Sequence, residues 1–580
     1  MGKNTGSRYT RKGLNKDMAA LDGKHFGLDK ALTILCFVIL FIIVLVPVVM
    51  IFYVTFFDEG KLDVHLFTEV ILDKGNVGAM WNTIKVALGA TVIGTVMGVF
   101  FAWLVGRSDI PTKGFMKAMF DIPYMFPPFF GAMAWDLMLN RRSGYINKWM
   151  MATFGLKKAP LNINSIWGII FVECCYYFPF VYKQVVNAFE RMDPTLEESA
   201  RIAGAGQGYV IRKITLPLVK PAISAGALLI LTSSLAHFGV PSMLGFSSKI
   251  YTLPTKIYQL FYRTTGSFEG IREGSALSIL LILVVVAALI LQKYLLRAGS
   301  YDIIKGKATR PMLIKLRGAK VPLLILAYLI LFIIVVMPLA MIILVGFLKA
   351  YGLPLNLANM TLDNYKQVLF NNTMVTDSIR NSIFLSISAG IICMFLGVMV
   401  AYVIVKVKPK GSMVLELLSL LPYAIPGIVM AIGVILTWSG RFKVNLYNTI
   451  WIILVAYLAR YLSFSMKSAS ASLQQVHPSL EEAARSCGAS HFMSLKDITI
   501  PLIKPAMVAG FFLIFLPAMR ELTTSVLLYG PNSRTLGVAI FSLRNDGYIT
   551  TASALASIAI ILIVVLNTIV NALLKDRKKG

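Results

Sequence analysis

Asp193-Pro-Thr-Leu-Glu-Glu-Ser-Ala-Arg-Ile-Ala-Gly-Ala-Gly is a polar stretch that returns later in the chain as His477-Pro-Ser-Leu-Glu-Glu-Ala-Ala-Arg-Ser-Cys-Gly-Ala-Ser. The first copy continues to Ile214-Thr-Leu-Pro-Leu-Val-Lys-Pro-Ala222, and the second continues to Ile498-Thr-Ile-Pro-Leu-Ile-Lys-Pro-Ala506. Matched positions lie 284 residues apart throughout (477 − 193 = 284), so the copies align without a gap. Two solvated loops of similar composition are the alternative, but they would not keep one register. We interpret the copies as a repeated structural unit.

Each copy has the signals of a helix, a turn and a second helix lying outside the bilayer. Pro194 and Pro478 suit a first helical turn, where the missing N–H is not needed, and the glutamates that follow favour the positive end of the helix. Gly204 and Gly488 are placed to end that helix, because glycine readily adopts the left-handed conformation. A later proline in each copy is predicted to restart the chain before the next membrane span.

The composition is that of a polytopic membrane protein. Of 580 residues, 57% are hydrophobic and the mean hydropathy is +0.73, whereas soluble domains average roughly 45–50% apolar residues. Only 14% of residues are charged, yet the net charge is +28. Lys and Arg collect in cytoplasmic loops of membrane proteins. We therefore expect the lipid bilayer as a partner, and no nucleic acid.

A membrane span needs roughly 20 apolar residues, and the chain contains two groups of six apolar stretches of about that length. They lie near residues 31–57, 80–106, 115–139, 165–187, 222–246 and 274–297, and then near 321–348, 379–406, 413–438, 447–468, 505–527 and 551–575. Six spans per half give both halves the same orientation, as a parallel repeat about an axis along the membrane normal. The sequence predicts an all-α polytopic membrane protein of about 12 transmembrane helices in two parallel six-helix repeats, with a pore between them.

The repeat extends into the spans themselves. Gly98-Val-Phe-Phe-Ala-Trp103 matches Gly397-Val-Met-Val-Ala-Tyr402 at an offset of 299 (397 − 98 = 299), while Ile166 and Ile450 already match at 284 (450 − 166 = 284). The first half therefore carries 15 extra residues (299 − 284 = 15). We place this insertion in an external loop around residues 140–164.

The repeated stretch resembles the EAA loop of ABC importer permeases, whose pattern is Glu-Ala-Ala, three residues, Gly, and later Ile-x-Leu-Pro. The second copy has Glu-Ala-Ala from Glu482, and the first has Glu-Ser-Ala from Glu198. The resemblance implies that each copy is a coupling loop, whose helix docks in a groove on a cytoplasmic ATPase. The residues that it assigns to coupling are Glu197, Glu198, Ala200, Gly204 and Pro217 in the first loop, and Glu481, Glu482, Ala483, Ala484, Gly488 and Pro501 in the second. Glu198 and Glu482 are expected to anchor the coupling helices.

The same resemblance implies the transmembrane permease subunit of a binding-protein-dependent ABC importer, with the type I permease fold. Two copies of an ATPase subunit, which bind ATP and Mg, are expected at the cytoplasmic face, and an extracytoplasmic binding protein is expected to deliver substrate. The sequence contains no Gly-x-x-x-x-Gly-Lys-Ser/Thr phosphate loop, so we expect neither an ATPase site nor a cofactor in this chain. An ion-driven secondary transporter also has twelve spans in two halves, but it would not need the paired polar loops.

The basic loops predict the orientation and the domain boundaries. With the N-terminus inside, the basic residues after spans two and eight, in the linker and in the tail all face the cytoplasm, as do both coupling loops; the basic residues at 141, 142, 157 and 158 are exceptions. We expect the bacterial inner membrane, with both chain ends cytoplasmic. The predicted parts are a basic N-terminus (1–30), a first permease domain (31–297, coupling loop 193–222), a cytoplasmic linker (298–320), a second permease domain (321–575, coupling loop 477–506) and a tail (576–580).

Ionisable and phenolic side chains within the spans are candidates for the translocation path, because buried charges are costly in a bilayer and usually face a cavity or a partner. The candidates are Glu173, His237, Tyr423, Arg460, Arg520 and Glu521. A structural ion pair is the alternative for Arg520 and Glu521, and a structural role is the alternative for His237. Prolines inside spans release backbone carbonyls that could line the same path, or they kink helices for packing. The scattered cysteines show no metal-binding spacing. The sequence therefore does not identify the ligands of a metal site.

Two further segments bear on the substrate. Phe238-Gly-Val-Pro241 and the segment from Arg520 to Tyr529 are similar to the double permeases of ferric-iron importers and their relatives for thiamine, 2-aminoethylphosphonate or sugar phosphates. That group often has an acidic residue where this chain has His237. Ferric iron, a hard cation, suits carboxylate and phenolate oxygens, which Glu173, Glu521, Tyr176, Tyr177 and Tyr423 could supply; the arginines suit a phosphate or carboxylate instead. Ferric iron is the favoured substrate, with an organophosphate, a phosphonate or thiamine as alternatives.

Overall fold

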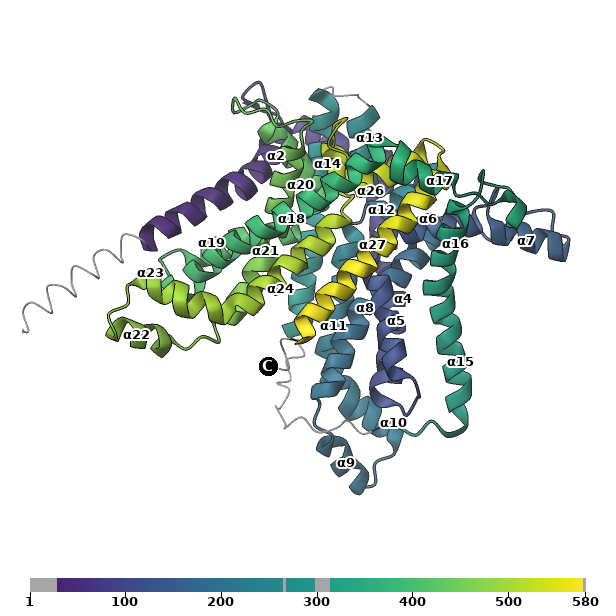
Figure 1. The fold of residues 1–580 in the computed structure, drawn as a ribbon, viewed down its shortest axis with the longest axis horizontal. Coiled ribbons are helices and arrows are strands. Elements are labelled where there is room, and N and C mark those ends of the chain that lie inside the picture. The colour runs from purple at the N-terminus through teal and green to yellow at the C-terminus, as the bar shows by residue number, and fades with distance from the viewer. Residues whose placement is uncertain (1–28, 264–267, 298–312, 577–580) are drawn as a thin grey trace, which may run out of the picture. The chain divides into compact units, whose positions relative to one another are not determined.

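The computed structural model describes residues 29–263, 268–297 and 313–576 (Figure 1). Most of the predicted N-terminal segment, much of the linker and most of the tail lie outside these residues. Within the described part, nearly all regular structure is helical, and one short antiparallel ribbon pairs β1 (Phe57–Asp58) with β2 (Lys61–Leu62). The predicted all-α polytopic class with two repeats is confirmed.

The helices of the first half follow the predicted order. They are η1 (Phe41–Leu45), α2 (Val46–Phe56), α3 (His65–Leu72), α4 (Lys74–Arg107), α5 (Lys113–Met125), α6 (Pro128–Leu139), α7 (Tyr145–Phe154), α8 (Ile166–Arg191), α9 (Thr195–Ile202), α10 (Gln207–Val210), η2 (Ile211–Thr215), α11 (Leu216–Leu235), α12 (Gly239–Gly245), η3 (Phe246–Ser248), α13 (Leu253–Arg263) and α14 (Phe268–Arg297).

The second half repeats this order. Its helices are η4 (Arg317–Ala319), α15 (Lys320–Leu331), η5 (Phe332–Val336), α16 (Met337–Gly346), η6 (Leu357–Asn359), α17 (Asp363–Lys366), η7 (Gln367–Asn371), α18 (Thr373–Tyr402), η8 (Val403–Val407), α19 (Ser412–Ala424), α20 (Gly427–Trp438), α21 (Ile450–Leu473), α22 (Pro478–Ser486), α23 (His491–Ser494), η9 (Leu495–Thr499), α24 (Ile500–Met519), α25 (Ser525–Leu528), α26 (Leu536–Asn545) and α27 (Ile549–Asp576).

Ten helices among the described residues are long and apolar enough to cross a membrane, and the broken pair α19–α20 makes an eleventh if it counts as one span. The remaining predicted span, 115–139, is covered by two helices, α5 and α6, with a break between them, and is not among these candidate spans. Each break falls at a proline: Phe126 before Pro127 is extended (φ −80°, ψ 143°), and α20 begins directly after Pro426. A residue before proline is disfavoured in the helical region, which ends the helix there.

Four other helices stay continuous past a proline by widening one turn. The wide turns η1, η2, η5 and η9 each lie just before a proline, namely Pro47, Pro217, Pro338 and Pro501. In each case the residue before the proline donates its N–H to the carbonyl five positions back. Proline has no N–H and its ring clashes with the carbonyl four residues earlier, so a π turn relieves the conflict without ending the helix.

Glycines let three helices of each half meet at one point. In the first half, a Cβ on Gly98 of α4 would lie 2.7 Å from the Val181 Cβ of α8, and a Cβ on Gly226 of α11 would lie 2.6 Å from the Val181 Cα. Small residues permit such close backbone approach between membrane helices. The equivalent positions in α18, α21 and α24 are Gly397, Ser465 and Gly510, with corresponding distances of 2.7 Å and 3.4 Å from the serine.

The insertion lies where the sequence predicts it. Residues 140–165 join α6 to α8, whereas residues 439–449 join α20 to α21, so the first connection is longer by 15 residues (26 − 11 = 15). The insertion includes α7. Asn147 of α7 holds this loop together by donating its side-chain amide to the carbonyls of Leu139, Asn140 and Leu161, at 2.9, 3.1 and 2.9 Å.

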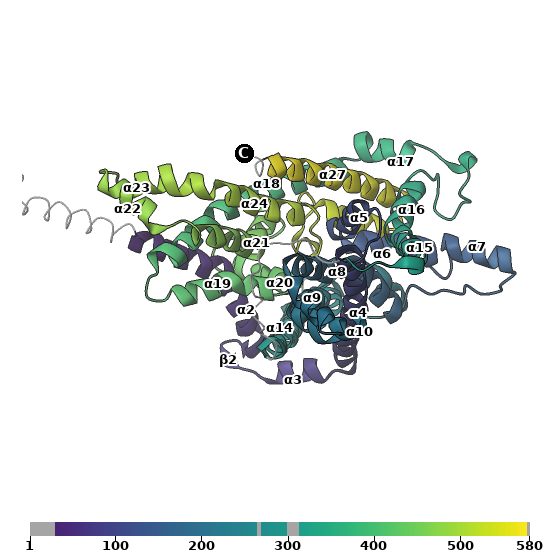
Figure 2. The same cartoon turned by 90° about the horizontal axis from the view of Figure 1, so that it is seen from below.

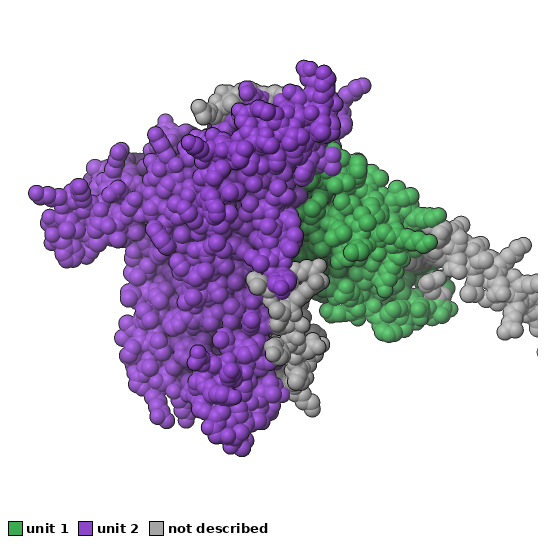
Figure 3. All heavy atoms as spheres, turned by 180° about the vertical axis from the view of Figure 1, so that it is seen from behind, with its two compact units in different colours: residues 1–48, 384–423, 454–519 green, residues 49–383, 424–453, 520–580 purple. Residues whose placement is uncertain are grey.

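The chain forms two compact units (Figure 3). One unit combines the described residues up to Val48 with Phe384–Tyr423 and Leu454–Met519; the other contains Val49–Ile383, Ala424–Ile453 and the residues from Arg520 onward. The units therefore do not follow the two halves of the sequence. The first span up to Val48 belongs to a unit with helices of the second half, and several segments of the second half belong to the unit that holds most of the first half. The predicted domain boundaries describe the sequence repeat and stay a prediction.

Candidate functional site

The two coupling loops have the same backbone. Gly204 and Gly488 each end the loop's first helix with a φ of +87°. The N–H after each glycine reaches back five residues, from Ala205 to the Ala200 carbonyl at 2.9 Å and from Ala489 to the Ala484 carbonyl at 3.0 Å. This satisfies carbonyls that a helix end leaves open. The prediction that these glycines terminate the helices is confirmed.

The later proline of each loop was predicted to restart the chain before the next span, and this prediction is wrong. Pro217 and Pro501 do not restart the chain, because the helices run without interruption over Gln207–Leu235 and Leu495–Met519. The predicted spans 222–246 and 505–527 therefore begin too late. The π turns described above let each helix pass its proline, so the second helix of the coupling loop continues directly into the span.

Glu197 is the buried glutamate of the first loop. Its side chain is 4% exposed and accepts hydrogen bonds from the Arg107 guanidinium, at the end of α4, and from the Thr215 hydroxyl at 2.6 Å, at the end of η2. The Arg107 guanidinium also lies 5.6 Å from the ring centroid of Phe189. Figures 1 and 2 both place α9 and α10 at one end of α4 and α8.

The second loop repeats these contacts with lysine in place of arginine. The Lys406 ammonium, in η8, lies 3.3 Å from a Glu481 carboxylate oxygen, which also accepts from the Thr499 hydroxyl at 2.8 Å. These side chains are less deeply buried, with 13% of Lys406 and 21% of Glu481 exposed. The ion pair thus lies at the same place in both loops, but it is more exposed to solvent in the second loop.

The glutamates of the Glu-Ala-Ala pattern lie on the outside of both loops. The side chains of Glu198 and Glu482 are exposed, as are Ala483 and, at 88% of its surface, Ile202, whereas Ala200 and Ala484 are half-buried. The contacts that anchor each coupling helix within the chain are therefore made by the preceding glutamate. A docking role for Glu198 and Glu482 stays a prediction.

Two of the intramembrane candidates contact each other. Glu173 of α8 is fully buried and accepts a hydrogen bond from Ser234 of α11, and the Nδ1 atom of His237 lies 3.0 Å from its other carboxylate oxygen. The His237 ring is 5.6 Å from the ring of Tyr177, centroid to centroid. α8, α11 and the short segment after α11 thus bring a carboxylate, a hydroxyl and an imidazole together.

Arg520 and Glu521 make different contacts although they are neighbours. The Arg520 guanidinium donates to the carbonyl of Met125, the last residue of α5 before its break. Glu521 accepts the backbone N–H groups of Thr524 and Ser525 at 2.6 and 3.0 Å, so its carboxylate caps the start of α25. The carbonyl at the end of α5 thus has a cation as its partner. That carbonyls released by the prolines line the translocation path stays a prediction.

Tyr423 and Arg460 belong to the other compact unit. Tyr423 is 48% exposed, and the Lys467 ammonium lies 4.9 Å from its ring centroid. The Arg460 guanidinium lies 5.8 Å from the ring centroid of Tyr461. Each therefore has a cation–π contact, a kind of interaction that aromatic rings commonly make with Arg and Lys.

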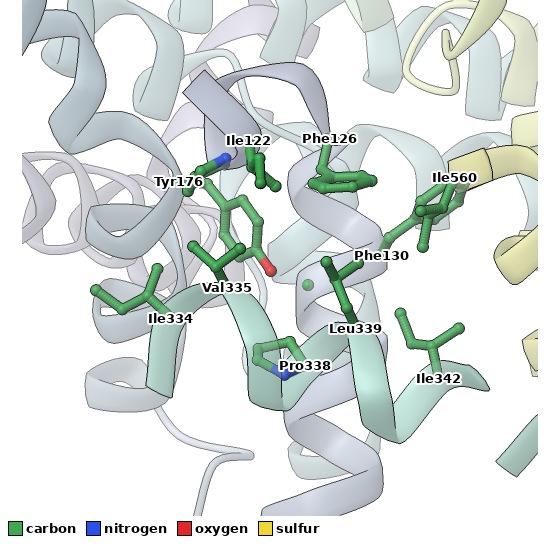
Figure 4. A pocket seen from close by; sticks show the side chains of 12 residues that line it. Ile122, Phe126, Phe130, Tyr176, Ile334, Val335, Pro338, Leu339, Ile342 and Ile560 are labelled. Atoms are coloured by element: carbon green, nitrogen blue, oxygen red, sulfur yellow. The ribbon is translucent and has the colours of Figure 1, made fainter. Parts of the chain in front are cut away.

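Tyr176 faces an apolar cavity (Figure 4). Its ring lies over Gly131, where a Cβ would approach the ring to 2.1 Å. The cavity is otherwise lined by aliphatic and aromatic side chains, among them Phe126, Val335 and Ile560. A phenol in these surroundings is poorly placed to bind a ferric ion together with carboxylates, so the expectation for Tyr176 is not supported.

Sequence reasoning missed a second buried ion pair. Asp136 of α6 is 3% exposed and binds the Arg544 guanidinium of α26. It also accepts the side-chain amides of Asn140 at 2.8 Å and Asn164 at 3.0 Å. This pair joins the two sequence halves within one compact unit. The missed signal was the aspartate inside an apolar stretch, since a buried aspartate needs a partner.

Comparisons with known proteins identify the family of the chain. Residues 94–298 and 393–578 each match the family described as binding-protein-dependent transport system inner membrane component. The ferric transport system permease protein FbpB of Actinobacillus pleuropneumoniae is 27% identical over 547 residues, covering 93% of this chain and 77% of that protein. PhnV of Salmonella paratyphi A, named for 2-aminoethylphosphonate transport, is 31% identical over 185 residues, covering 32% of this chain and 69% of PhnV. One solved chain, from a bacterial alginate ABC transporter in complex with its periplasmic protein, matches at 19% identity with a TM-score of 0.40, covering 49% of this chain and 98% of that one.

Both repeats of the membrane domain thus match one family, and the paired coupling loops lie inside the matched regions. The chain belongs to the family of binding-protein-dependent transport system inner membrane components, the permease subunits of ABC importers.

Proposed function

We propose that this chain forms the translocation path of an ATP-driven importer for ferric iron. The supporting observation is the extent of the likeness to FbpB, which runs through 93% of the chain and hence through both halves. The likeness to a phosphonate permease covers 32% of the chain. A path formed by both halves is better represented by a relative that matches both.

The partners follow from the family. Two ATPase subunits would dock beneath the two coupling loops, and a binding protein outside the membrane would deliver the substrate, with both chain ends in the cytoplasm. When ATP draws the ATPases together, the coupling helices would follow and the pore would open outward. The paired loops, whose first helices end with the same glycine conformation and the same backbone bond, support two ATPase copies.

The cluster of Glu173, Ser234 and His237 is the part of the proposed path that best suits a ferric ion in transit. A carboxylate and a hydroxyl are oxygen donors, which hard cations prefer, and here they lie beside an imidazole at 3.0 Å from the carboxylate. All three residues belong to the first half: Glu173 lies in α8, Ser234 in α11, and His237 just after α11. A ferric ion would be cargo at this point, held briefly and released.

An organophosphonate is the second candidate, and Arg520 is the observation that favours it. Its guanidinium binds the Met125 carbonyl at the α5 break, and guanidinium groups suit phosphate and phosphonate oxygens. Such a substrate could replace the carbonyl as the partner of Arg520. The likeness to PhnV supports the same candidate.

Uptake measurements with the complete transporter test both candidates. Cells carrying this chain, its ATPase and its binding protein should accumulate radiolabelled ferric iron, and Glu173→Gln should lower that uptake because it removes the charged oxygen donor. Labelled 2-aminoethylphosphonate is the second probe. Phosphonate uptake that is lost with Arg520→Ala, together with no iron uptake in any strain, would overturn the iron proposal and establish its rival.

A further inference from the structure

We infer that Glu197 and Glu481 are positioning residues that clamp each coupling helix to the end of an earlier span, α4 or the helix that ends in η8, and to the span that follows the loop. The inference rests on the proposed docking of ATPases at these loops and adds a means of transmission. In each loop one carboxylate joins three elements: the coupling helix, the basic residue at the end of α4 or η8, and the threonine that ends η2 or η9.

The clamp is needed because the chain segments that join the coupling helix to its neighbouring helices are short and flexible. In the first loop, the helix is reached through Met192 to Pro194 and left through Gly204 to Gly206. Short irregular segments of this kind can rotate about a few dihedral angles, and glycine is the most permissive residue. A helix held only by its two ends could tilt when an ATPase moves it. A third attachment through Glu197 makes the helix and both spans move together.

Helix formation itself does not require these carboxylates. Glycine closes each helix at its C-terminal end with the backbone bonds described above. The Glu197 carboxylate leaves its own helix to reach Arg107, 90 positions earlier, and Thr215, 18 positions later. The Glu481 carboxylate likewise reaches Thr499, 18 positions later. The same spacing in both loops indicates a retained contact between elements.

The linker reinforces the clamp in the first half. The Ile314 N–H donates to the Arg107 carbonyl at 2.7 Å, and the Asp109 N–H donates to the Ile314 carbonyl at 3.1 Å. The Asp109 carboxylate accepts the Leu316 N–H at 3.0 Å. Ile314 also lines the small cavity beside Arg107 and Glu197. The linker thus fixes the backbone of the residue that holds the glutamate, and we expect the first clamp to be the stiffer one.

The test uses the complete transporter in proteoliposomes and separates docking from transmission. Co-purification of the ATPase reports docking, and stimulation of ATP hydrolysis by the substrate-loaded binding protein reports transmission. Glu197→Gln with Glu481→Gln should keep the ATPase bound while the stimulation falls by roughly 5- to 150-fold, the usual range for coupling between linked sites. Glu190→Gln is the matched control, because Glu190 pairs with Lys117 at 2.9 Å on the surface, where about half of each side chain is exposed.

Rescue variants distinguish a clamp from a general loss of structure. Arg107→Lys should retain stimulation, because the second loop already uses Lys406, and the exchange of charges in Arg107→Glu with Glu197→Arg should restore part of what either change alone removes. Thr215→Val is a milder probe should the charge variants fail to fold, and it should lower stimulation as well. Full stimulation in the double glutamine variant would overturn the clamp, and so would full stimulation in Thr215→Val should the glutamine variant fail to fold. A wild-type chain that binds no ATPase would instead refute the proposed function, on which the clamp rests.

Discussion

Gly98→Ala should destabilise the first half, and the structure gives the size of the effect. The new Cβ would lie 2.8 Å from the Phe178 carbonyl oxygen and 3.0 Å from the Tyr182 nitrogen. Both are backbone atoms, so no side chain can rotate away and α4 must separate from α8. Overpacking of this kind costs about 1–3 kcal/mol, while replacing glycine in a helix recovers about 0.4–1 kcal/mol. We expect a net loss of roughly 1–2 kcal/mol.

Gly78→Ala is the matched control in the same helix. A Cβ at Gly78 meets no atom within 4 Å, so this change should be neutral or should stabilise by about 0.5–1 kcal/mol through helix propensity. The assay is thermal unfolding of the detergent-purified chain, followed by the loss of the folded peak in size-exclusion chromatography. Gly98→Ala should unfold at a lower temperature than the wild type, and Gly78→Ala should not. Equal midpoints for the two variants would refute the packing argument.

Three further changes have defined outcomes. Glu521→Ala should lower the unfolding temperature, because two buried N–H groups lose their acceptor at a cost of about 1–3 kcal/mol, whereas Glu521→Gln should lose less. Asn147→Ala should make the loop around α7 a site of rapid proteolysis while leaving the core intact. Contacts with the Leu316 N–H and with Lys320 lower the pKa of Asp109 below its ordinary value of 3.8. Its contribution to holding the linker is therefore complete above that value and is lost as pH falls through the lowered pKa, so linker proteolysis should be constant from neutral pH to pH 5, and Asp109→Ala should accelerate it at neutral pH.

The register of the repeat was the most predictable feature of the fold. A gap-free offset of 284 implies equivalent helix bounds, and α8, α9 and α11 do have counterparts in α21, α22 and α24 that start within one residue of that offset. The position of the insertion follows from the change of offset alone. Turn glycines were predictable too, since the left-handed conformation strongly favours glycine over other residues. These predictions depend on local sequence, which the repeat supplies twice.

The helix breaks and the contacts of Glu197 and Glu481 could not be predicted from local sequence patterns. A proline inside a span can end the helix, as Pro127 does, or be passed by a π turn, as at Pro217. Which outcome occurs depends on the neighbours that each helix packs against. Likewise, Glu197 and Glu198 are adjacent and chemically identical, and only the fold shows which one faces Arg107. A signal was present, because Arg107 and Lys406 keep the offset of 299 (406 − 107 = 299).

The compact units could not be read from the repeat for a related reason. Sequence similarity identifies segments with a common pattern, whereas packing depends on which apolar faces are buried together. The first span up to Val48 has no unusual residue that assigns it to helices of the second half. Its exposed and buried faces are both apolar, so its partner is set by shape, which hydropathy does not describe.

Equivalent positions in a duplicated chain need not share a role. Positions 237 and 521, which keep the offset of the repeat (521 − 237 = 284), illustrate this. His237 contacts a carboxylate on a neighbouring helix, whereas Glu521 caps the short helix that follows it in its own chain segment. The negative charge of Glu521 is thus stabilised by backbone N–H groups, and moving it toward a passing cation would break those bonds. Glu173 is held by side chains that can rotate, namely a serine and a histidine, so it can change partners at lower cost. For this reason Glu173 is the residue whose substitution should most directly separate substrate handling from assembly.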